Sequence, residues 1–177
     1  MQIRFVEHIP HADRDDPRGS ITVICPWLKG LSPESGLWVA VLPIHDVNDF
    51  VDSEEVFKAP GDGDLAFYFG LFALDRFRSP TRLLAQLRRK GIERIVNVPS
   101  VSFFDGRSTS ILESLGLGHE QEVAFLRQAK LQGFRVALCA RRSTLGAIED
   151  IGMFDAVLCH DGPRSDFSLR RSGSPVA

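Results

Sequence analysis

"LAFYFGLFALDRFRSPTRLLAQLRRKGIERIVNV", residues 65–98, contains the pattern of a strand, a helix and a second strand in one continuous run. Its two ends, 65–72 and 94–98, are apolar without interruption, as strands covered on both faces tend to be. Between them Ser79 is a predicted helix N-cap and Gly91 a predicted helix end. A strand, a helix and a strand in this order predict a parallel sheet with helices outside it.

Other segments of the chain repeat this alternation. The further predicted strands are 21–25, 134–140 and 154–159, with a weaker candidate at 36–42. The further predicted helices are about 47–58, 119–132 and 143–152. No internal repeat interrupts the series, so we expect one α/β domain.

The two ends of the chain do not fit the same pattern. Residues 2–9 alternate as a strand does, but a short polar connection separates them from the strand at 21–25. A parallel neighbour needs a crossover, usually a helix, so we expect residues 2–9 to pair antiparallel at an edge or to lie elsewhere. Residues 164–177 are expected to form a flexible tail.

The composition excludes several classes of protein. A chain of 177 residues that is 44% hydrophobic and 25% charged is typical of one globular domain. The net charge of -2 gives no support to nucleic-acid binding, and no apolar stretch is long enough to predict a membrane span. The first residues lack the pattern of a signal peptide, so we expect a cytoplasmic location.

The motifs of cofactor and metal sites are also missing from the sequence. There is no GxGxxG or Walker loop and no Cys-x-x-Cys, and the five histidines are scattered, so neither a cofactor nor a metal is predicted. Cys25, Cys139 and Cys159 are odd in number and lie in apolar runs, which predicts buried thiols.

Polar side chains follow the predicted strands, where ligands bind in parallel α/β folds. These residues are Lys29, Asp75, Arg78, Asn97, Asp105, Arg107, Arg141, Arg142, His160 and Asp161. Carboxylates and an imidazole can transfer protons, and arginines can hold a carboxylate or a phosphate. Strand ends are also surfaces, which are charged in any case. Arg141 and Arg142 are expected on a solvated face, whereas His160 either ends a strand or acts in a site.

The segment "NVPSVSFFDGRS", residues 97–108, is the strongest candidate for a functional loop. It does not continue into a helical pattern, and about twenty residues separate the strand at 94–98 from the helix at 119–132. Loops of that length in compact domains are usually functional or disordered. Apolar anchors such as Phe103 and Phe104 favour an ordered, functional loop.

Three segments resemble the phosphoenolpyruvate hydrolase-like TIM-barrel family. "NVPSVSFFDG" (97–106), "LESLGLGHEQEV" (112–123) and "LCHDG" (158–162) are similar to that family's "NFPTVGLIDG", "LEETGMGY-x-x-EV" and "AHMG". "LPIHDVND" (42–49) and "ALDRFR" (73–78) are similar to two motifs further upstream. The resemblance extends over residues 21–162.

The resemblance implies a partial TIM-like (β/α) barrel with about five parallel strands and outer helices, lacking the first and last β/α units. We expect an N-terminal strand and linker at 1–20, the barrel-like domain at 21–163 and the tail at 164–177. The motif positions imply the site residues Asp46, Asn48, Asp75, Arg78, Asn97, Pro99, Asp105, Gly106, Glu113, His160 and Gly162. Lys29 and Arg107 are added as cations that follow predicted strands.

Two functions remain open from the sequence. In the first, the protein binds a small anionic ligand, phosphorylated or carboxylated, and acts as a hydrolase or lyase on it. Asp105 or Glu113 would then be the base, His160 the acid, and Arg78 and Arg107 would neutralise the substrate. In the second, it is a non-catalytic assembly or regulatory subunit. Open sheet edges predict a homo-oligomer or a hetero-complex in either case.

Overall fold

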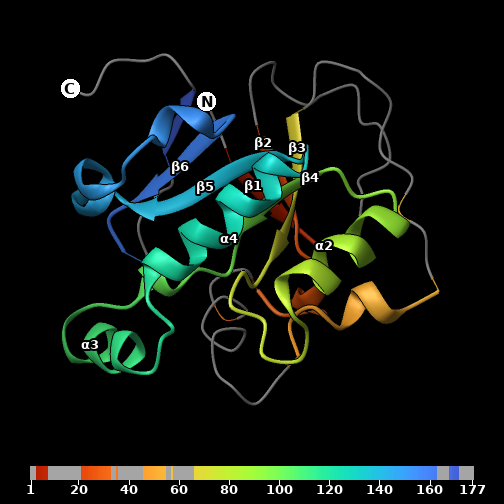
Figure 1. Cartoon of the computed structure of the whole chain (residues 1–177), viewed down its shortest axis with the longest axis horizontal. Coiled ribbons are helices and arrows are strands. Elements are labelled where there is room, and N and C mark those ends of the chain that lie inside the picture. The colour runs from red at the N-terminus through yellow and green to blue at the C-terminus, as the bar shows by residue number, and fades with distance from the viewer. Residues whose placement is uncertain are drawn as a thin grey trace.

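A computed structural model of the chain describes residues 3–7, 21–32, 35, 46–54, 57, 66–162 and 168–171. Its strands are β1 (Ile3–Val6), β2 (Ile21–Ile24), β3 (Ala66–Leu71), β4 (Arg94–Asn97), β5 (Arg135–Arg141), β6 (Ala156–His160) and β7 (Ser168–Arg171). The strands β1 to β6 lie in one sheet in sequential order and run parallel, and β7 pairs antiparallel with β6. The expected α/β partial barrel is therefore confirmed, with six parallel strands in a curled half-barrel (Figure 1).

The α-helices described are α2 (Pro80–Arg89), α3 (Gly106–Ser114) and α4 (His119–Leu131). Short 3₁₀ turns are η1 (Pro26–Leu28), η2 (Asp49–Asp52), η3 (Val101–Phe103), η4 (Arg142–Ala147) and η5 (Ile151–Met153). The start and end signals of α2 act as predicted. The Ser79 hydroxyl accepts a hydrogen bond from the backbone N–H of Arg82, and Gly91 has the positive φ of 75° that ends a helix.

Each face of the sheet carries its own apolar core. The helices α2 and α4 cover one face, where Leu71 and Leu138 are buried (Figure 1). On the other face Val96 and Cys139 pack with Phe103 and with Trp27 of η1. Alternate strand residues point to opposite faces, so each strand contributes to both cores. This explains why the strands are apolar without interruption.

The close packing of the second face requires a glycine in β3. A Cβ atom at Gly70 would lie 2.7 Å from the carbonyl oxygen of Val98 and 2.9 Å from the sulfur of Cys25. The indole Nε1 of Trp27 donates a hydrogen bond of 3.2 Å to the Gly70 carbonyl. A side chain at this position would push apart the strand ends that carry the polar residues described below.

The placement of β1 differs from the expectation. Its residues pair parallel with β2, Ile3 opposite Ile21, instead of antiparallel at an edge. A parallel crossover needs a dozen or more residues but not necessarily a helix, and the chain between β1 and β2 is long enough. The expectation was wrong because it treated the helix as obligatory. Residues 8–20 lie outside the described part of the chain.

The segment after β4 is also more regular than expected. It contains η3 and then α3, where a loop without helix was predicted. Gly106 has a φ of 53°, a conformation that favours glycine and turns the chain into α3. The helical pattern was hidden because no residue of α3 is buried, so the segment lacks an apolar stripe.

Three further expectations are corrected. The predicted helix at 47–58 is a single 3₁₀ turn, η2, in its described part, although Val47, Phe50 and Val51 are buried as expected. The predicted helix at 143–152 is divided into η4 and η5. Four residues of the expected tail form β7. The weaker strand candidate at 36–42 lies outside the described residues.

Over the ranges that the structure describes, no helix is long and apolar enough to cross a bilayer. Cys25, Cys139 and Cys159 are buried free thiols, as predicted. Burial raises the pKa of the Cys25 and Cys139 thiols well above their ordinary value.

Candidate functional site

Arg78 stands at the centre of the first polar group, which follows β3 and which we call the Arg78 cluster (Asp46, Asn48, Asp52, Asp75 and Arg78). The Arg78 side chain is only 4% exposed. Its guanidinium binds Asp46 through two nitrogens, at 3.0 and 2.8 Å, and also binds Asp75 at 3.0 Å and Asp52. Hydrogen bonding to Asp46 is the main reason why the pKa of Arg78 is raised.

The arrangement explains four of the predicted site residues in structural terms. The side-chain amide of Asn48 donates to Asp75 at 2.8 Å and to the Phe72 carbonyl at 2.9 Å, and its oxygen accepts from the Phe72 N–H. All three guanidinium nitrogens of Arg78 already bind carboxylates. Arg78 therefore joins η2 to the turn after β3. Because its guanidinium nitrogens are already bound to carboxylates, none is left to bind a substrate anion.

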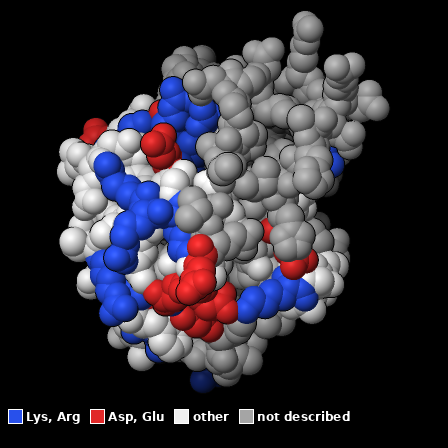
Figure 2. Space-filling model, turned by 90° about the vertical axis from the view of Figure 1, so that its right-hand side faces the viewer, with Lys and Arg blue, Asp and Glu red and all other residues white. Residues whose placement is uncertain are grey.

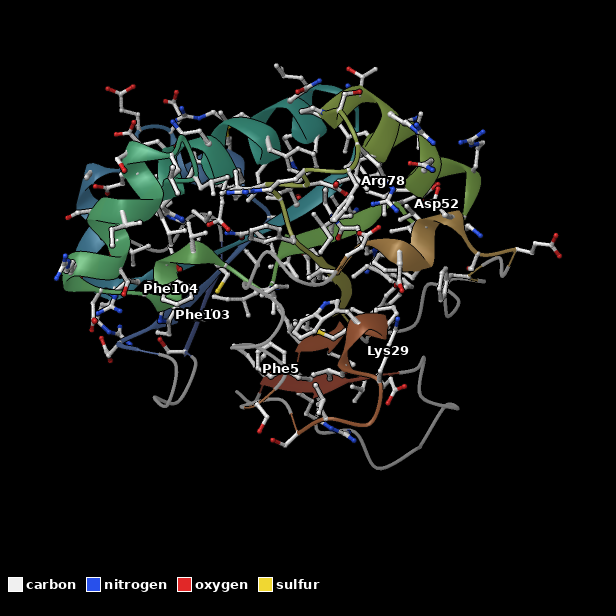
Figure 3. All side chains as sticks on the ribbon, turned by 90° about the horizontal axis from the view of Figure 1, so that it is seen from below. Phe5, Lys29, Asp52, Arg78, Phe103 and Phe104 are labelled. Carbon is white, nitrogen blue, oxygen red and sulfur yellow. The ribbon has the colours of Figure 1, made fainter. Side chains whose placement is uncertain are left out.

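Figure 2 shows the side of the molecule on which α2 and η2 lie, where acidic side chains gather in a group with basic ones on both sides. Lys29 has an exposed ion pair with Asp49 and does not line the pocket described below. Arg107 is exposed on α3. In Figure 3 Arg78 and Asp52 point toward each other, far from Phe103 and Phe104 at the opposite side of the view. The predicted cations thus do not converge on one pocket.

Glu122 of α4 is the centre of the second polar group, which we call the Glu122 network (Asn97, Ser100, Ser102, His119, Glu122 and His160). The Glu122 side chain is fully buried. One carboxylate oxygen accepts hydrogen bonds from Ser100 Oγ at 2.7 Å, His119 Nδ1 at 2.8 Å and Asn97 Nδ2 at 3.1 Å. The other oxygen accepts from the backbone N–H of Val101 at 3.0 Å.

Asn97 connects this network to the sheet. Its side-chain oxygen accepts from the Cys139 N–H at 2.7 Å, and its amide nitrogen donates to the Cys139 carbonyl at 3.0 Å. The side chain thereby continues the ladder between β4 and β5 beyond the last backbone pair. The cis peptide bond between Val98 and Pro99 then leads the chain into η3. Asn97 and Pro99, both predicted site residues, therefore shape the loop.

His160 lies at the end of β6 and is buried. Its Nε2 is 2.9 Å from Ser102 Oγ, and its ring packs on Phe103 with centroids 4.7 Å apart. Burial, helped by the charge of Arg141, lowers the pKa of His160 to about 4. The ring is consequently neutral at pH 7, which does not support the expected role as an acid near neutral pH. Gly162 has a backbone hydrogen bond with this ring.

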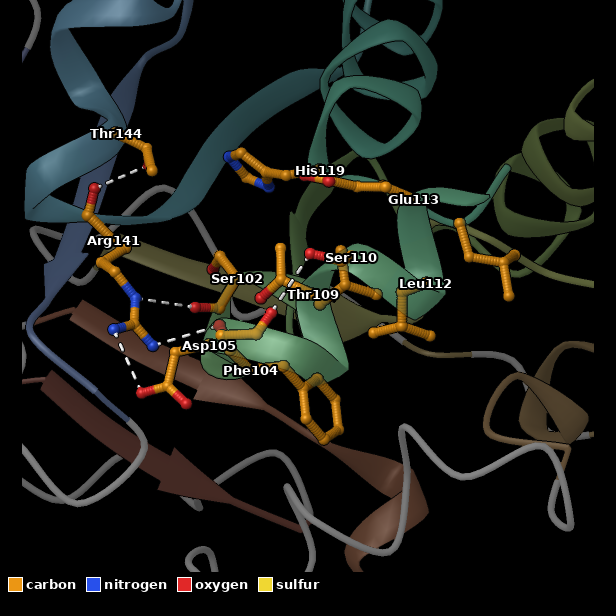
Figure 4. Close-up of a pocket in the computed structure, with 14 residues that line it drawn as sticks. Ser102, Phe104, Asp105, Thr109, Ser110, Leu112, Glu113, His119, Arg141 and Thr144 are labelled. Carbon is orange, nitrogen blue, oxygen red and sulfur yellow. Dashed lines mark hydrogen bonds and ion pairs between the residues drawn. The ribbon is translucent and has the colours of Figure 1, made fainter. Parts of the chain in front are cut away.

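A pocket of about 330 Å³ opens beside the network, at the carboxyl ends of β4 and β5 (Figure 4). Its walls come from η3, α3, the first residue of α4 and the end of β5. The polar residues that line it are Ser102, Asp105, Thr109, Ser110, Glu113, His119, Arg141 and Thr144. This volume is at the lower end of the range for small-molecule sites.

Arg141 borders the pocket and is largely buried, not on a solvated face as expected. Nε donates to the Ser102 carbonyl at 3.3 Å, and Nη2 donates to the Phe103 and Phe104 carbonyls at 3.3 and 3.2 Å (Figure 4). Nη1 lies 3.6 Å from Asp105, whose side chain is 80% exposed. Such a long, solvated ion pair is weak, so Asp105 is held only loosely at this guanidinium nitrogen.

Two buried polar atoms on pocket-lining residues have no hydrogen-bond partner among the described residues: His119 Nε2 and Thr109 Oγ1. An unsatisfied buried group destabilises a protein by about 1–3 kcal/mol. Both atoms are able to pair with an oxygen, because a threonine hydroxyl can donate or accept and an imidazole nitrogen does either according to its protonation.

Three predicted residues, Asp105, Gly106 and Glu113, line this pocket. Asp105 and Glu113 are exposed at its rim, a position that gives little support to a base role. Sequence reasoning missed Glu122, Ser102 and His119. Glu122 had a signal, because it lies next to Val123 and four residues before Leu126, on the buried face of α4.

Comparison with known proteins reveals similarity along most of the chain. Residues 33–163 match a family described as phosphoenolpyruvate hydrolase-like. The uncharacterized protein y4oT of Sinorhizobium fredii (strain NBRC 101917 / NGR234) is 35% identical over 134 residues, which are 76% of this chain and 63% of that protein. The ToMV resistance protein Tm-1(GCR237) and the ToMV susceptible protein tm-1(GCR26) of Solanum lycopersicum are each 32% identical over 137 residues. That alignment covers 76% of this chain and 18% of each tomato protein, so the chain spans less than two thirds of all three relatives.

Proposed function

The chain belongs to the phosphoenolpyruvate hydrolase-like family, and from this premise we propose that it binds a small carboxylated or phosphorylated acid in the pocket beside Arg141. The observation that carries the proposal is the pair of unpartnered buried atoms, His119 Nε2 and Thr109 Oγ1, on residues that line one pocket. A ligand oxygen there would offset their lost hydration.

The charges around the pocket favour an acid over a neutral ligand. Arg141 is oriented by three carbonyls, and only its loosely held Nη1 contact with Asp105 must be exchanged for a ligand carboxylate or phosphate. Gly118, the N-cap of the 13-residue helix α4, also lines the pocket and forms no side-chain capping bond. The positive end of the helix dipole therefore supports an anion at the same place.

The test is thermal unfolding and calorimetric titration with phosphoenolpyruvate, malate and 3-phosphoglycerate, with glycerol as the uncharged comparison. A binding acid at 100 times its Kd stabilises the protein by about 2.7 kcal/mol. Arg141→Gln is expected to weaken binding about tenfold or more, since hydrogen bonds to charged groups contribute about 1.5–3 kcal/mol. Arg142→Gln is the matched control, because Arg142 is the exposed neighbour that pairs with Asp161 outside the pocket.

Unchanged affinity in the Arg141→Gln protein, or equal weakening by Arg142→Gln, would place the ligand elsewhere. Absence of stabilisation by all of the acids would count against the proposal itself. Replacement of the rim residue Glu113 by glutamine tests how its negative charge affects binding of the acid. Removal of a like charge next to the anion is expected to tighten binding, whereas a ligand that needs Glu113 as an acceptor would bind less well.

A second function, assembly with a further copy of this chain, is favoured by α3. This helix has no buried residue, and Ile111 and the C-cap residue Leu115, four positions apart, are 50% and 63% exposed. We expect the wild-type protein to be a dimer or larger in light scattering at micromolar concentration. The double change Ile111→Ser with Leu115→Ser is expected to shift it to the monomer, while Leu131→Ser, at an exposed leucine of α4, leaves it unchanged. A wild-type monomer would contradict this.

A further inference from the structure

Ser102 is the hydroxyl at which the Glu122 network meets the pocket. Its side chain lines the pocket, although the residue is only 8% exposed. The hydroxyl oxygen lies 2.9 Å from Nε2 of His160 and 2.8 Å from Ser100 Oγ. A serine hydroxyl within hydrogen-bond reach of an imidazole, with the imidazole held by another group, is the arrangement of an activated nucleophile.

The surrounding hydrogen bonds leave two acceptors within reach of the Ser102 proton. Ser100 donates its own proton to the Glu122 carboxylate at 2.7 Å, and its oxygen accepts from the Ser102 N–H at 3.1 Å. The two acceptors that the Ser102 hydroxyl can reach are Ser100 Oγ at 2.8 Å and His160 Nε2 at 2.9 Å. When the hydroxyl points toward Nε2, its proton lies on the path to the imidazole.

His160 accepts the Ser102 proton in the tautomer that carries the ring proton on Nδ1, because Nε2 is then the acceptor that faces Ser102 Oγ. The ring also has a hydrogen bond with the Gly162 backbone. Burial lowers the pKa of the ring to about 4, so the ring is neutral at pH 7.

We propose that Ser102 is a nucleophile, with His160 as its general base, which cleaves esters of small carboxylic acids bound in the pocket. The inference rests on the proposed ligand pocket and adds the class of substrate and the reacting atom. Glu122 and Ser100 are positioning residues, because they hold η3 and orient Ser102 without contact with the ester.

The reaction balances with water as the only co-reactant. Ser102 Oγ forms a bond to the ester carbonyl carbon while its proton passes to His160 Nε2. The bond from that carbon to the alcohol oxygen breaks, and the alcohol leaves with the proton from His160. Water then attacks the acyl-serine with His160 again as base, which releases the acid and restores the Ser102 hydroxyl. Arg141, which lines the same pocket, is the cation that would stabilise the carbonyl oxygen as it becomes negative.

The test is covalent labelling with diisopropyl fluorophosphate, in which a serine oxygen displaces fluoride from phosphorus. Intact mass spectrometry is expected to find one label per chain, and peptide mapping to place it on Ser102. Ser102→Ala is expected to abolish labelling, and His160→Gln to slow it by about 100-fold or more. Ser114→Ala is the control, because that hydroxyl lies on α3 outside the pocket and donates to the Ile111 carbonyl.

The pH profile of the wild-type protein provides a reading that does not depend on the folding of a variant. The labelling rate is expected to be constant between about pH 6 and pH 8 and to fall as the pH approaches about 4, where His160 takes up a proton. A rate that instead rises tenfold per pH unit would indicate hydroxide-driven reaction at an unactivated serine and would overturn the proposal. Label on any other residue would overturn it too.

The binding and labelling experiments separate the two proposals. Stabilisation by a small acid together with absence of labelling would contradict the proposal that Ser102 is a nucleophile, but it would still support the proposed ligand pocket. Labelling of Ser102 that malate or phosphoenolpyruvate slows in proportion to its occupancy would support both. Labelling of Ser102 without binding of any acid would support the nucleophile while removing acids from the proposed ligands.

Discussion

Replacement of Glu122 with alanine is expected to lower the free energy of unfolding by about 3–5 kcal/mol, because it leaves buried donors without an acceptor. The abandoned groups are Asn97 Nδ2, Ser100 Oγ, the Val101 N–H and His119 Nδ1. Glu122→Gln keeps the shape but places an NH₂ group among donors, so we expect a smaller loss of about 2–3 kcal/mol. Urea unfolding measures both.

The neighbouring residue Glu120 supplies the control. It lies in the same first turn of α4 but is exposed, so Glu120→Gln is expected to change stability by no more than about 0.5 kcal/mol. A Glu122→Ala protein as stable as the Glu120→Gln protein would mean that the network contributes nothing to η3. Because the network also positions Ser102, the Glu122→Gln protein is expected to remain folded while its rate of labelling at Ser102 falls.

Arg78→Ala is the second change with a large expected effect, about 3–5 kcal/mol of unfolding free energy. It would leave two carboxylates without their cation. These are Asp75, whose side chain is 3% exposed, and Asp46, whose side chain is 27% exposed. Asp52 contributes less, because its side chain is 47% exposed and water solvates it. The exposed neighbour Arg76 is the control, and Arg76→Ala is expected to change stability by less than about 0.5 kcal/mol.

A double-mutant cycle gives this prediction its sharpest form. If the loss arises from a stranded carboxylate, Arg78→Ala combined with Asp75→Asn should be more stable than the sum of the two single changes predicts. Additive losses would show that Arg78 acts through packing alone. Denaturation midpoints at neutral pH are sufficient to distinguish these outcomes.

The same cluster predicts how stability depends on pH. Hydrogen bonding to Arg78 lowers the pKa of Asp52 from the ordinary value of 3.8. The Asp52–Arg78 interaction therefore stabilises the folded state fully above about pH 4. This stabilisation is lost as the pH falls through the lowered pKa of Asp52 in the folded state. In the Arg78→Ala protein this part of the acid destabilisation is expected to disappear.

Sequence reasoning predicted the parts of the fold that local pattern controls. The apolar runs that became β2 to β6 are buried on both faces, and the caps of α2 are read directly from Ser79 and Gly91. It failed where the pattern was weak. The helix α3 has no buried face, so its sequence carries no helical stripe, and parallel pairing of β1 depends on a partner strand 18 residues away.

The predicted site residues proved to be partly structural and partly pocket residues, for a related reason. The carboxylates around Arg78 satisfy it internally, whereas Arg141, expected on the surface, is held at a pocket. Side-chain type and position along a strand do not reveal whether a charged group is already paired. That depends on residues brought together from distant parts of the chain.

The sequence by itself determined the family and the α/β class, because these follow from motif spacing and from apolar periodicity within short segments. Only the tertiary structure decided which polar groups meet. Asn97, Glu122 and His160 are 25 and 38 residues apart in succession, and the curled parallel sheet brings their strand and helix ends to one edge. The Glu122 network and the pocket beside it exist because buried polar groups must find partners in space, wherever those partners lie in the chain.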